Sequence, residues 1–316
     1  MTPTQLRAYA AVVRHGSVKR AAAELKVSES AVSLNIGQLR KELGDQLFTR
    51  TSAGLAFTPG GLRLASRSAE LLGLQDRTIL EVSEAGRGRR LLRVAASSLF
   101  AEHAAPGLLE LFGARAADLD VELSVRDPAQ FETLLLTRAA DIAIGPLPGR
   151  LDPALISRPV MNHQIVLVTG PGHPLATGHT SVSRLREQTW LLGPSAASNL
   201  GAVTAMLRRL AVPEDRQQIF QSHAAALEET KRDKGVAPVL SFSVAQDLTE
   251  HRLVRVSGSV PTIDGQWHTI RLSAATAAAD ELSRFASTPR AIQAMVRGTG
   301  VNVGRFRPSI HVTLWS

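Results

Sequence analysis

The stretch GSVKRAAAELKVSESAVSLNI at residues 16–36 predicts two short helices joined by a tight turn. Ser17 and Ser28 each stand where a hydroxyl can cap the following helix by accepting a hydrogen bond from one of its first N–H groups. Apolar residues at helical spacing give each helix one buried face, over residues 18–25 in the first and 32–43 in the second. This pattern is typical of a helix-turn-helix, whose second helix enters the major groove of DNA.

The opposite face of the second helix is polar or small, so it is free to meet base edges. Two strand-like runs follow at 47–50 and 55–58, and their place after a helix-turn-helix predicts a wing. Arg50, at the base of this wing, is a predicted contact to phosphate or to the minor groove. The predicted DNA-binding residues are Ser28, Glu29, Ser30, Ser33, Leu34, Arg50 and Thr51.

Positive charge is concentrated in the first third of the chain. Residues 1–93 hold 15 Lys and Arg against 8 Asp and Glu, whereas residues 94–316 hold 21 against 20. Contacts to phosphate dominate the affinity of a protein for nucleic acid and need clustered cations. The asymmetry favours a head that binds double-stranded DNA, carried on a nearly neutral body with another task; the alternative is that the bias serves solubility.

Composition excludes several classes of protein. The 316 residues include no cysteine, which excludes disulfides, cysteine-type zinc fingers and thiol switches. The nine histidines show no paired spacing typical of a metal site, and neither a phosphate-binding loop nor a nucleophile elbow occurs. We therefore expect no enzyme, no metal and no cofactor. Apolar runs fall far short of the roughly 20 residues of a membrane span, and the N-terminus lacks signal-peptide character, so we expect a cytoplasmic protein that does not contact membranes.

A long amphipathic helix is predicted from residue 59 to about residue 85. Its apolar stripe must be buried, and a second copy of the same helix is the partner we expect, with packing on its own chain as the alternative. Glycines and arginines at 86–90 then predict a hinge. The predicted dimerisation residues are Leu62, Ala65, Ala69, Leu72 and Ile79.

From residue 91 the pattern changes to alternating strands and helices, which predicts a parallel sheet with helices on its faces. A long strand-like passage at 159–169 leads into a second lobe, and a return strand at 267–274 leads back. The expected first lobe spans about 91–160 and 267–300, and the second about 161–266. Small molecules bind between two such lobes. The predicted elements of the first lobe are strands at 91–96, 121–125 and 141–145 and helices at 99–113, 128–138, 278–287 and 289–297.

Together these parts resemble the LysR-type transcriptional regulators over roughly residues 1–300. The resemblance is most specific in residues 16–59, where AAAELKVSESAVSLNIGQLRKELGDQLFTRT at 21–51 follows the family's head nearly position by position. The resemblance implies an α+β winged helix-turn-helix at 1–58, a linker and dimerisation helix with a hinge at 59–90, and an α/β two-lobed, periplasmic-binding-protein-like effector domain at 91–300. It implies a dimer or tetramer in which a small effector alters DNA binding or contacts with RNA polymerase. An architectural DNA-binding protein is the alternative, and an enzyme on a binding-protein scaffold is a remote one.

The head departs from the usual family pattern at several positions. Glu29 and Ser30 stand where the family commonly has Gln-Pro, Leu34 where it has arginine, and Gly37 where it has a basic residue. Loss of an arginine removes a reader of guanine worth about 1–3 kcal/mol of discrimination, so we expect an unusual sequence preference. The tail at 301–316 exceeds the usual length, and residues 310–314 alternate like an edge strand.

Candidate effector contacts come from helix starts around the predicted cleft. Ser97 and Ser98 precede a helix, where hydroxyls and free N–H groups suit an anion, although a plain N-cap explains the same residues. Asp127 stands where the family often has Thr or Ser, and its carboxylate would repel an acidic effector. In the second lobe the candidates, again with capping as the alternative, are Ser195, Ser198, Asn199 and His223.

Overall fold

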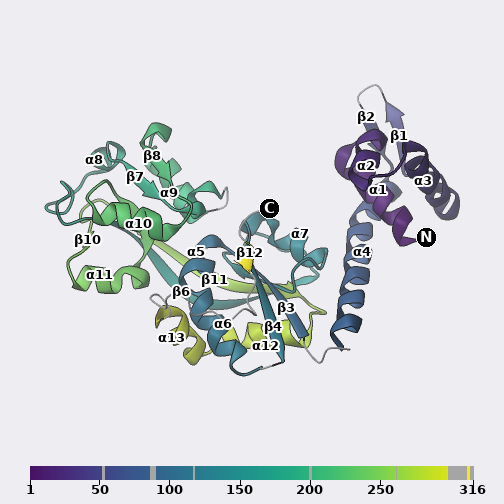
Figure 1. Cartoon of the computed structure of the whole chain (residues 1–316). Helices are drawn as coiled ribbons and strands as arrows, with labels where there is room; N and C mark the ends of the chain where they lie inside the picture. The colour runs from purple at the N-terminus through teal and green to yellow at the C-terminus, as the bar shows by residue number, and fades with distance from the viewer. Residues whose placement is uncertain are drawn as a thin grey trace. The chain divides into compact units, whose positions relative to one another are not determined.

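The computed structural model describes residues 1–51, 54–85, 90–116, 118–198, 201–260, 262–297 and 312–313. The chain forms two compact units: residues 1–88 with 136–139, and residues 89–135 with 140–316 (Figure 1). Within the described part, no helix is both long enough and apolar enough to span a bilayer.

The first unit begins with the predicted helix-turn-helix. Thr2 forms a capping box with Gln5, and Gly16 ends the first helix in the left-handed region (φ 59°), where glycine is favoured. Ser17 and Ser28 cap the next two helices as predicted. The three helices pack around a buried core that includes Tyr9, Val12, Val32, Ile36 and Leu39. They are α1 (Pro3–His15), α2 (Val18–Leu25) and α3 (Glu29–Leu43).

A two-stranded wing and a long helix complete this unit. Strands β1 (Phe48–Thr51) and β2 (Gly54–Phe57) pair antiparallel, and α4 (Pro59–Ala85) follows over the predicted range. The start of α4 is fixed to the core because the Tyr9 hydroxyl donates to the carbonyl oxygen of Gly61 at 2.8 Å. Burial is the main cause that raises the pKa of Tyr9 to about 12.

The second unit is built on a curled sheet whose first half is parallel. Strands β3 (Arg90–Ala96), β4 (Leu119–Val125) and β5 (Ile142–Gly145) lie in the order β4–β3–β5. The helices of this half are α5 (Ser98–His103), α6 (Ala105–Gly113), α7 (Phe131–Leu136), α12 (Ala277–Ala286) and α13 (Pro289–Arg297). Strand β12 (Val312–Thr313) adds to the edge beside β4, within the stretch that the sequence predicts as an edge strand.

Two predicted helices of this half are wrong in detail. The helix predicted at 99–113 is divided at Ala104, since Pro106 stands in the first turn of α6 and cannot supply the N–H that a continuous helix needs. The helix predicted at 128–138 begins instead with a 3₁₀ turn, Pro128–Gln130, before α7.

Two long strands join the halves of the second unit. Strand β6 (Leu155–Thr169) starts four residues before its predicted position, and it pairs antiparallel with β11 (Ile263–Leu272) along the whole length of β11. At the first-lobe end β11 lies between β6 and β5, and the far end of β6 pairs with two strands of the second lobe, β9 (Ala237–Leu240) and β10 (Val254–Arg255). The remaining elements of that lobe are α8 (Val182–Arg186), β7 (Trp190–Leu192), α9 (Ala202–Leu210), β8 (Gln217–Ile219), α10 (His223–Lys231) and α11 (Ala245–Thr249).

The backbone at Gly61 lies so close to Leu47 that substitution of this glycine tests how tightly the head is packed. A Cβ atom at Gly61 would lie 2.0 Å from the carbonyl oxygen of Leu47, whereas a Cβ at Gly37 on α3 would meet nothing within 4 Å. We expect Gly61→Ala to lower the free energy of unfolding of the head by roughly 1–3 kcal/mol through overpacking. Gly37→Ala should instead stabilise it by roughly 0.5–1 kcal/mol through helix propensity.

Thermal melts read by circular dichroism and by tryptophan fluorescence separate the two units, because all three tryptophans lie beyond residue 189. The Gly61 change should move the circular dichroism melt and leave the fluorescence melt in place. Equal melting temperatures of Gly61→Ala and Gly37→Ala by circular dichroism would contradict the close contact between Gly61 and Leu47.

Candidate DNA-binding face and effector cleft

The outer face of α3 is exposed, as the sequence predicts. Ser28 caps the helix and shares a 2.8 Å hydrogen bond with the hydroxyl of Ser30. Glu29 and Ser33 are exposed, and the side chain of Leu34 is 64% exposed. This face therefore presents two carboxylate oxygens, three hydroxyls and one apolar group to a partner.

Arg40 holds the wing against α3, a role that the sequence analysis missed. Its guanidinium donates to the carbonyl oxygens of Gln46 and Phe48, both at 2.7 Å, and lies 4.7 Å above the Phe48 ring. Thr51 is exposed at the end of β1, and Arg50 lies in the same strand, but its side chain is outside the described part. A surface hollow of about 290 Å³ lies between helix and wing, lined by Val18, Ser33, Ile36, Arg40, Gln46, Phe48 and Thr49.

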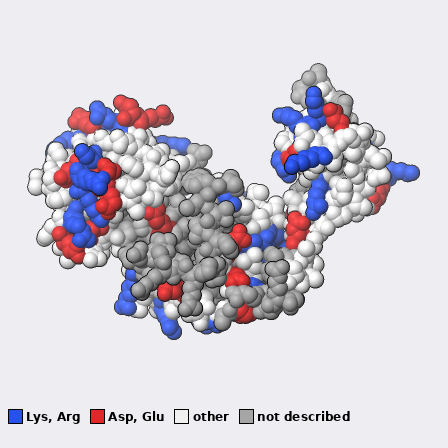
Figure 2. Space-filling model, in the orientation of Figure 1, with Lys and Arg blue, Asp and Glu red and all other residues white. Residues whose placement is uncertain are grey.

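Cations are exposed on the head, among them Lys19, Arg20 and Lys26 on and after α2. Figure 2 shows Lys and Arg prominent on the head, whereas the second lobe displays both signs of charge together. Such a distribution matches the phosphate backbone of DNA.

A cavity of about 520 Å³ lies between the two lobes of the second unit. Ser97, Ser98 and Asp127 line it from the first lobe, and Ser195 and Ser198 line it from the second. The predicted candidate Asn199 lies outside the described residues. The rest of the lining is mainly apolar and includes Leu99, Val125, Pro128, Ile165, Val203 and Trp267. A mostly apolar pocket with a few polar groups is typical of a small-molecule site.

Three buried polar atoms in this lining have no hydrogen-bond partner within the described part of the chain. They are Oγ of Ser97, Oγ of Ser198 and Nδ1 of His163. Ser97 precedes α5 but makes no side-chain capping bond, so capping does not account for it. Asp127 differs, because its carboxylate accepts from the N–H of Ala129 at 2.8 Å and caps the turn that follows. Buried polar groups are nearly always paired, so the orphaned atoms make this cavity the candidate binding site.

Helix α9 begins at the wall of the same cavity. Gly201 is its N-cap and offers no side-chain cap, and Gly201, Ala202 and Val203 all line the cavity. The first N–H groups of a helix lack intrahelical partners and carry a partial positive charge. Together with the Ser198 hydroxyl, they can receive an anionic or other accepting group of a ligand.

His223 does not line the cavity, in contrast to its prediction as an effector contact. Its Nε2 lies 2.9 Å from Oγ of Ser195, which does line it, and its Nδ1 lies 2.7 Å from Oε2 of Glu102. The Glu102 carboxylate also accepts from the N–H groups of His223 and Ala224, so it caps α10 across the seam between the lobes. Burial raises the pKa of Glu102, but the bonds and charge of His223 outweigh this effect and bring it to about 2.

Comparison with known proteins follows the division into two units. The model of bacterial regulatory helix-turn-helix proteins of the lysR family matches residues 3–62, and the model of the LysR substrate binding domain matches residues 85–288. The chain belongs to the LysR family. The HTH-type transcriptional regulator Rv0377 of Mycobacterium tuberculosis is 57% identical to it over all of both chains.

Two further proteins are similar to this chain at lower identity. The RuBisCO operon transcriptional regulator of Allochromatium vinosum is 27% identical over 84% of this chain and 88% of its own. The crystal structure of ArgP from Mycobacterium tuberculosis matches the fold with a TM-score of 0.61 at 18% identity, over 90% of this chain and 97% of that one. This LysR-type protein is a DNA-binding transcriptional regulator with an effector domain, and its relatives support neither the architectural nor the enzymatic alternative.

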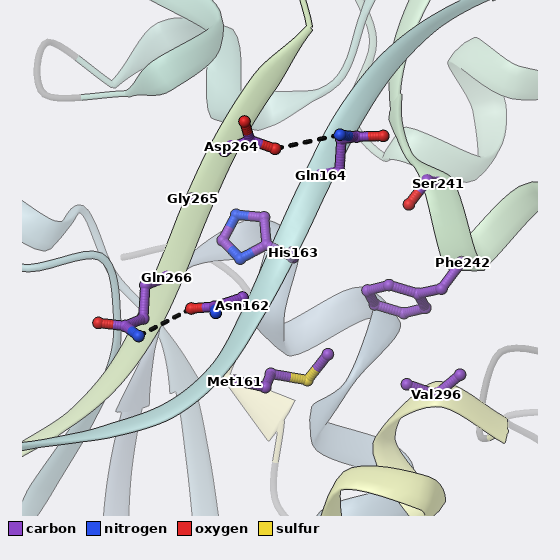
Figure 3. Close-up of a pocket in the computed structure, with 10 residues that line it drawn as sticks. All are labelled: Met161, Asn162, His163, Gln164, Ser241, Phe242, Asp264, Gly265, Gln266 and Val296. Carbon is purple, nitrogen blue, oxygen red and sulfur yellow. Dashed lines mark hydrogen bonds between the residues drawn. The ribbon is translucent and has the colours of Figure 1, made fainter.

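A second, larger hollow of about 820 Å³ in the LysR-type effector domain lies beside β6 and β11 (Figure 3). His163, Gly265 and Gln266 line both hollows. The His163 ring stacks on Trp267 with centroids 4.4 Å apart, and a Cβ at Gly265 would lie 2.5 Å from its Nε2. Burial lowers the pKa of His163 to about 4, so the imidazole stays neutral near pH 7. Polar pairs such as Gln266 with Asn162 (2.7 Å) cover the strands on this side.

Exposure of Ser33 makes a specific prediction for DNA binding. Ser33→Tyr should weaken binding to the protein's own operator by tenfold or more, about 1.4 kcal/mol, because the added ring occupies the space that DNA must enter. Electrophoretic mobility shift with a promoter fragment measures the loss. The melting temperature should stay within about 1 °C, since an exposed substitution rarely changes stability much.

Gln218→Tyr, at an exposed position of β8 in the effector domain, is the matched control and should bind DNA like the wild type. A fall in melting temperature for Ser33→Tyr alone would show that Ser33 is structural.

Proposed function

We propose that a small organic effector binds in the 520 Å³ cavity and changes how this regulator binds DNA or contacts RNA polymerase. The observation that carries the proposal is the pair of buried hydroxyls, Ser97 in the first lobe and Ser198 in the second, without partners in the described structure. A ligand that bonds both would connect the lobes through its own atoms. Each unpaired buried polar group costs about 1–3 kcal/mol, which such a ligand recovers on binding.

The lining also indicates the kind of effector. An accepting group fits Ser198 and the start of α9, and a donating group fits the carboxylate of Asp127. An apolar body fits between Trp267, Ile165 and the side chains beside them. We infer a compact amphipathic metabolite that carries both an acceptor and a donor, because a cation, Arg126, and an anion, Asp127, stand next to each other in the lining.

Removal of the orphaned hydroxyls tests this proposal. Ser97→Ala and Ser198→Ala should leave the melting temperature of the free protein unchanged or raise it, because each removes an unsatisfied buried group. Both should reduce the melting shift that an effector produces, and both should weaken the effect of that effector on DNA binding. A thermal-shift screen of small carboxylates, amino acids and hydroxy acids on the wild type supplies the effector.

Ser181→Ala is the matched control, because Ser181 caps α8 by accepting from the N–H of Arg184. This change should cost about 1 kcal/mol of stability and leave the effector shift intact. An effector that shifts the wild type and both cavity variants equally would refute contact with these hydroxyls.

We further propose that α4 mediates self-association in the cytoplasm, as a dimer that can build a tetramer. Among the described side chains of this helix, the exposed large apolar ones are Leu62, Leu71, Leu74, Ile79 and Val82. Of the five residues predicted to form the dimerisation stripe, only Leu62 and Ile79 are exposed. Ala65 packs against the head core, and Ala69 and Leu72 are half-buried. By helical spacing Leu71, Leu74, Ile79 and Val82 share one broad side of α4, whereas Leu62 lies on the opposite side. An exposed apolar face of this kind is typical of an interface between proteins.

Ile79→Lys should weaken this association, because the helix pair would have to bury an unpaired charge. Sedimentation velocity should show a smaller species, and affinity for a two-half-site operator should fall with it. Ser66→Lys places the same charge at an exposed polar position of α4 and should sediment like the wild type. Unchanged sedimentation of Ile79→Lys would remove this residue from the interface.

A further inference from the structure

Three potential metal ligands meet at the seam between the lobes, behind the effector cavity. Glu102 and His103 are the last two residues of α5 in the first lobe, and His223 is the first residue of α10 in the second. One ligand atom from each lies within 4.8 Å of the other two, and this is the one such group found in the described ranges. The two imidazole rings are tilted by 59° with their centroids 5.6 Å apart, so they do not stack.

The distances need only small adjustments to hold an ion. Bonds of about 2.0–2.2 Å in a tetrahedral zinc site place neighbouring ligand atoms roughly 3.4 Å apart. Glu102 Oε2 and His223 Nδ1 are now 2.7 Å apart and share a proton. An ion in place of that proton would widen their separation by less than ~1 Å and draw His103 inward. His103 makes no side-chain hydrogen bond to another described residue, so its ring nitrogens are available.

The surroundings fix the imidazole of His223 and limit the size of what can bind. A Cβ at Gly193 would lie 2.2 Å from Cδ2 of His223, so the ring packs directly against backbone. A cavity of about 10 Å³ beside the two imidazoles is lined by His103, His223 and Gly193 and by mainly apolar side chains such as Leu99, and Glu102 is not part of its lining. That volume leaves room for about one water-sized body next to the histidines.

We propose that Glu102, His103 and His223 bind one divalent transition-metal ion, with Zn²⁺ the best match to two imidazoles and a carboxylate. Metal-bound histidines characteristically donate their second ring N–H to an oxygen, which fixes the ring. His223 already has that geometry, because its Nε2 lies 2.9 Å from the hydroxyl of Ser195. The ion would therefore join the two lobes and orient Ser195, a residue that lines the effector cavity.

The test is zinc binding by the full-length protein after treatment with a chelator, measured by equilibrium dialysis against ZnCl₂. We expect one ion per chain in the wild type and in His179→Ala, which removes an exposed histidine outside the cluster. His103→Phe keeps an aromatic ring beside His223 and should raise the dissociation constant by roughly 100-fold. Co²⁺ in place of Zn²⁺ should give the visible absorption of a tetrahedral site in the wild type and lose it in His103→Phe.

Two further measurements, neither of which needs an effector, complete the test of the zinc site. Glu102→Gln should also lose the ion, and circular dichroism melts should show that each variant tested is folded. Zinc retained by folded His103→Phe, or lost equally by His179→Ala, would overturn the site. Because dialysis needs no effector, this outcome is independent of whether a small molecule binds in the 520 Å³ cavity.

Discussion

The antiparallel pairing of β6 with β11 is the constraint on which the effector domain depends. Its register runs from Ile263 opposite Ile165 to Leu272 opposite Leu155, so two continuous strands pass through both lobes. The register shifts between Trp267 and His268, at the point where Trp267 packs against His163 and Phe100. Rotation of one lobe against the other must bend these strands, because no other paired strands in the described chain span the two halves. A ligand at Trp267 therefore acts where the two lobes are joined.

Polar side chains at the boundary between the lobes differ in how many hydrogen bonds they make. The Glu102 carboxylate accepts three hydrogen bonds from the start of α10, including two from backbone N–H groups. The hydroxyls of Ser97 and Ser198, in the cavity, have none among the described residues. Charge-assisted bonds are roughly twice as strong as neutral ones, so Glu102 secures the rear of the seam. The hydroxyls in the cavity remain for the proposed effector to pair with.

Local signals predicted the head well because its elements are fixed by neighbouring residues. Capping serines, Gly16 and the proline at the start of α4 each act within one helical turn, and the observed helices begin where they indicate. Contacts between distant residues were beyond the sequence. Glu102 and His223 are 121 positions apart. Arg40 lies only eight positions from Phe48, but its bond to that carbonyl oxygen depends on how the chain turns between α3 and β1, which no local pattern fixes. The cavity shows the same limit: all four predicted serines line it, whereas His223 lies outside it and contacts the hydroxyl of Ser195.

Leu34 shows how the recognition face and the rest of the head divide the work of DNA binding. An exposed leucine on α3 contributes nothing to the core, so its position is left free for a partner. It can offer apolar contact to a thymine methyl group but no hydrogen bond to guanine. Ser30 and Ser33 add short hydroxyls that can meet any of several acceptors and donors. We therefore expect discrimination by this face to rest on apolar contact and on the fit of helix and wing, which Arg40 holds together, and exposed cations of the head to supply affinity to any sequence.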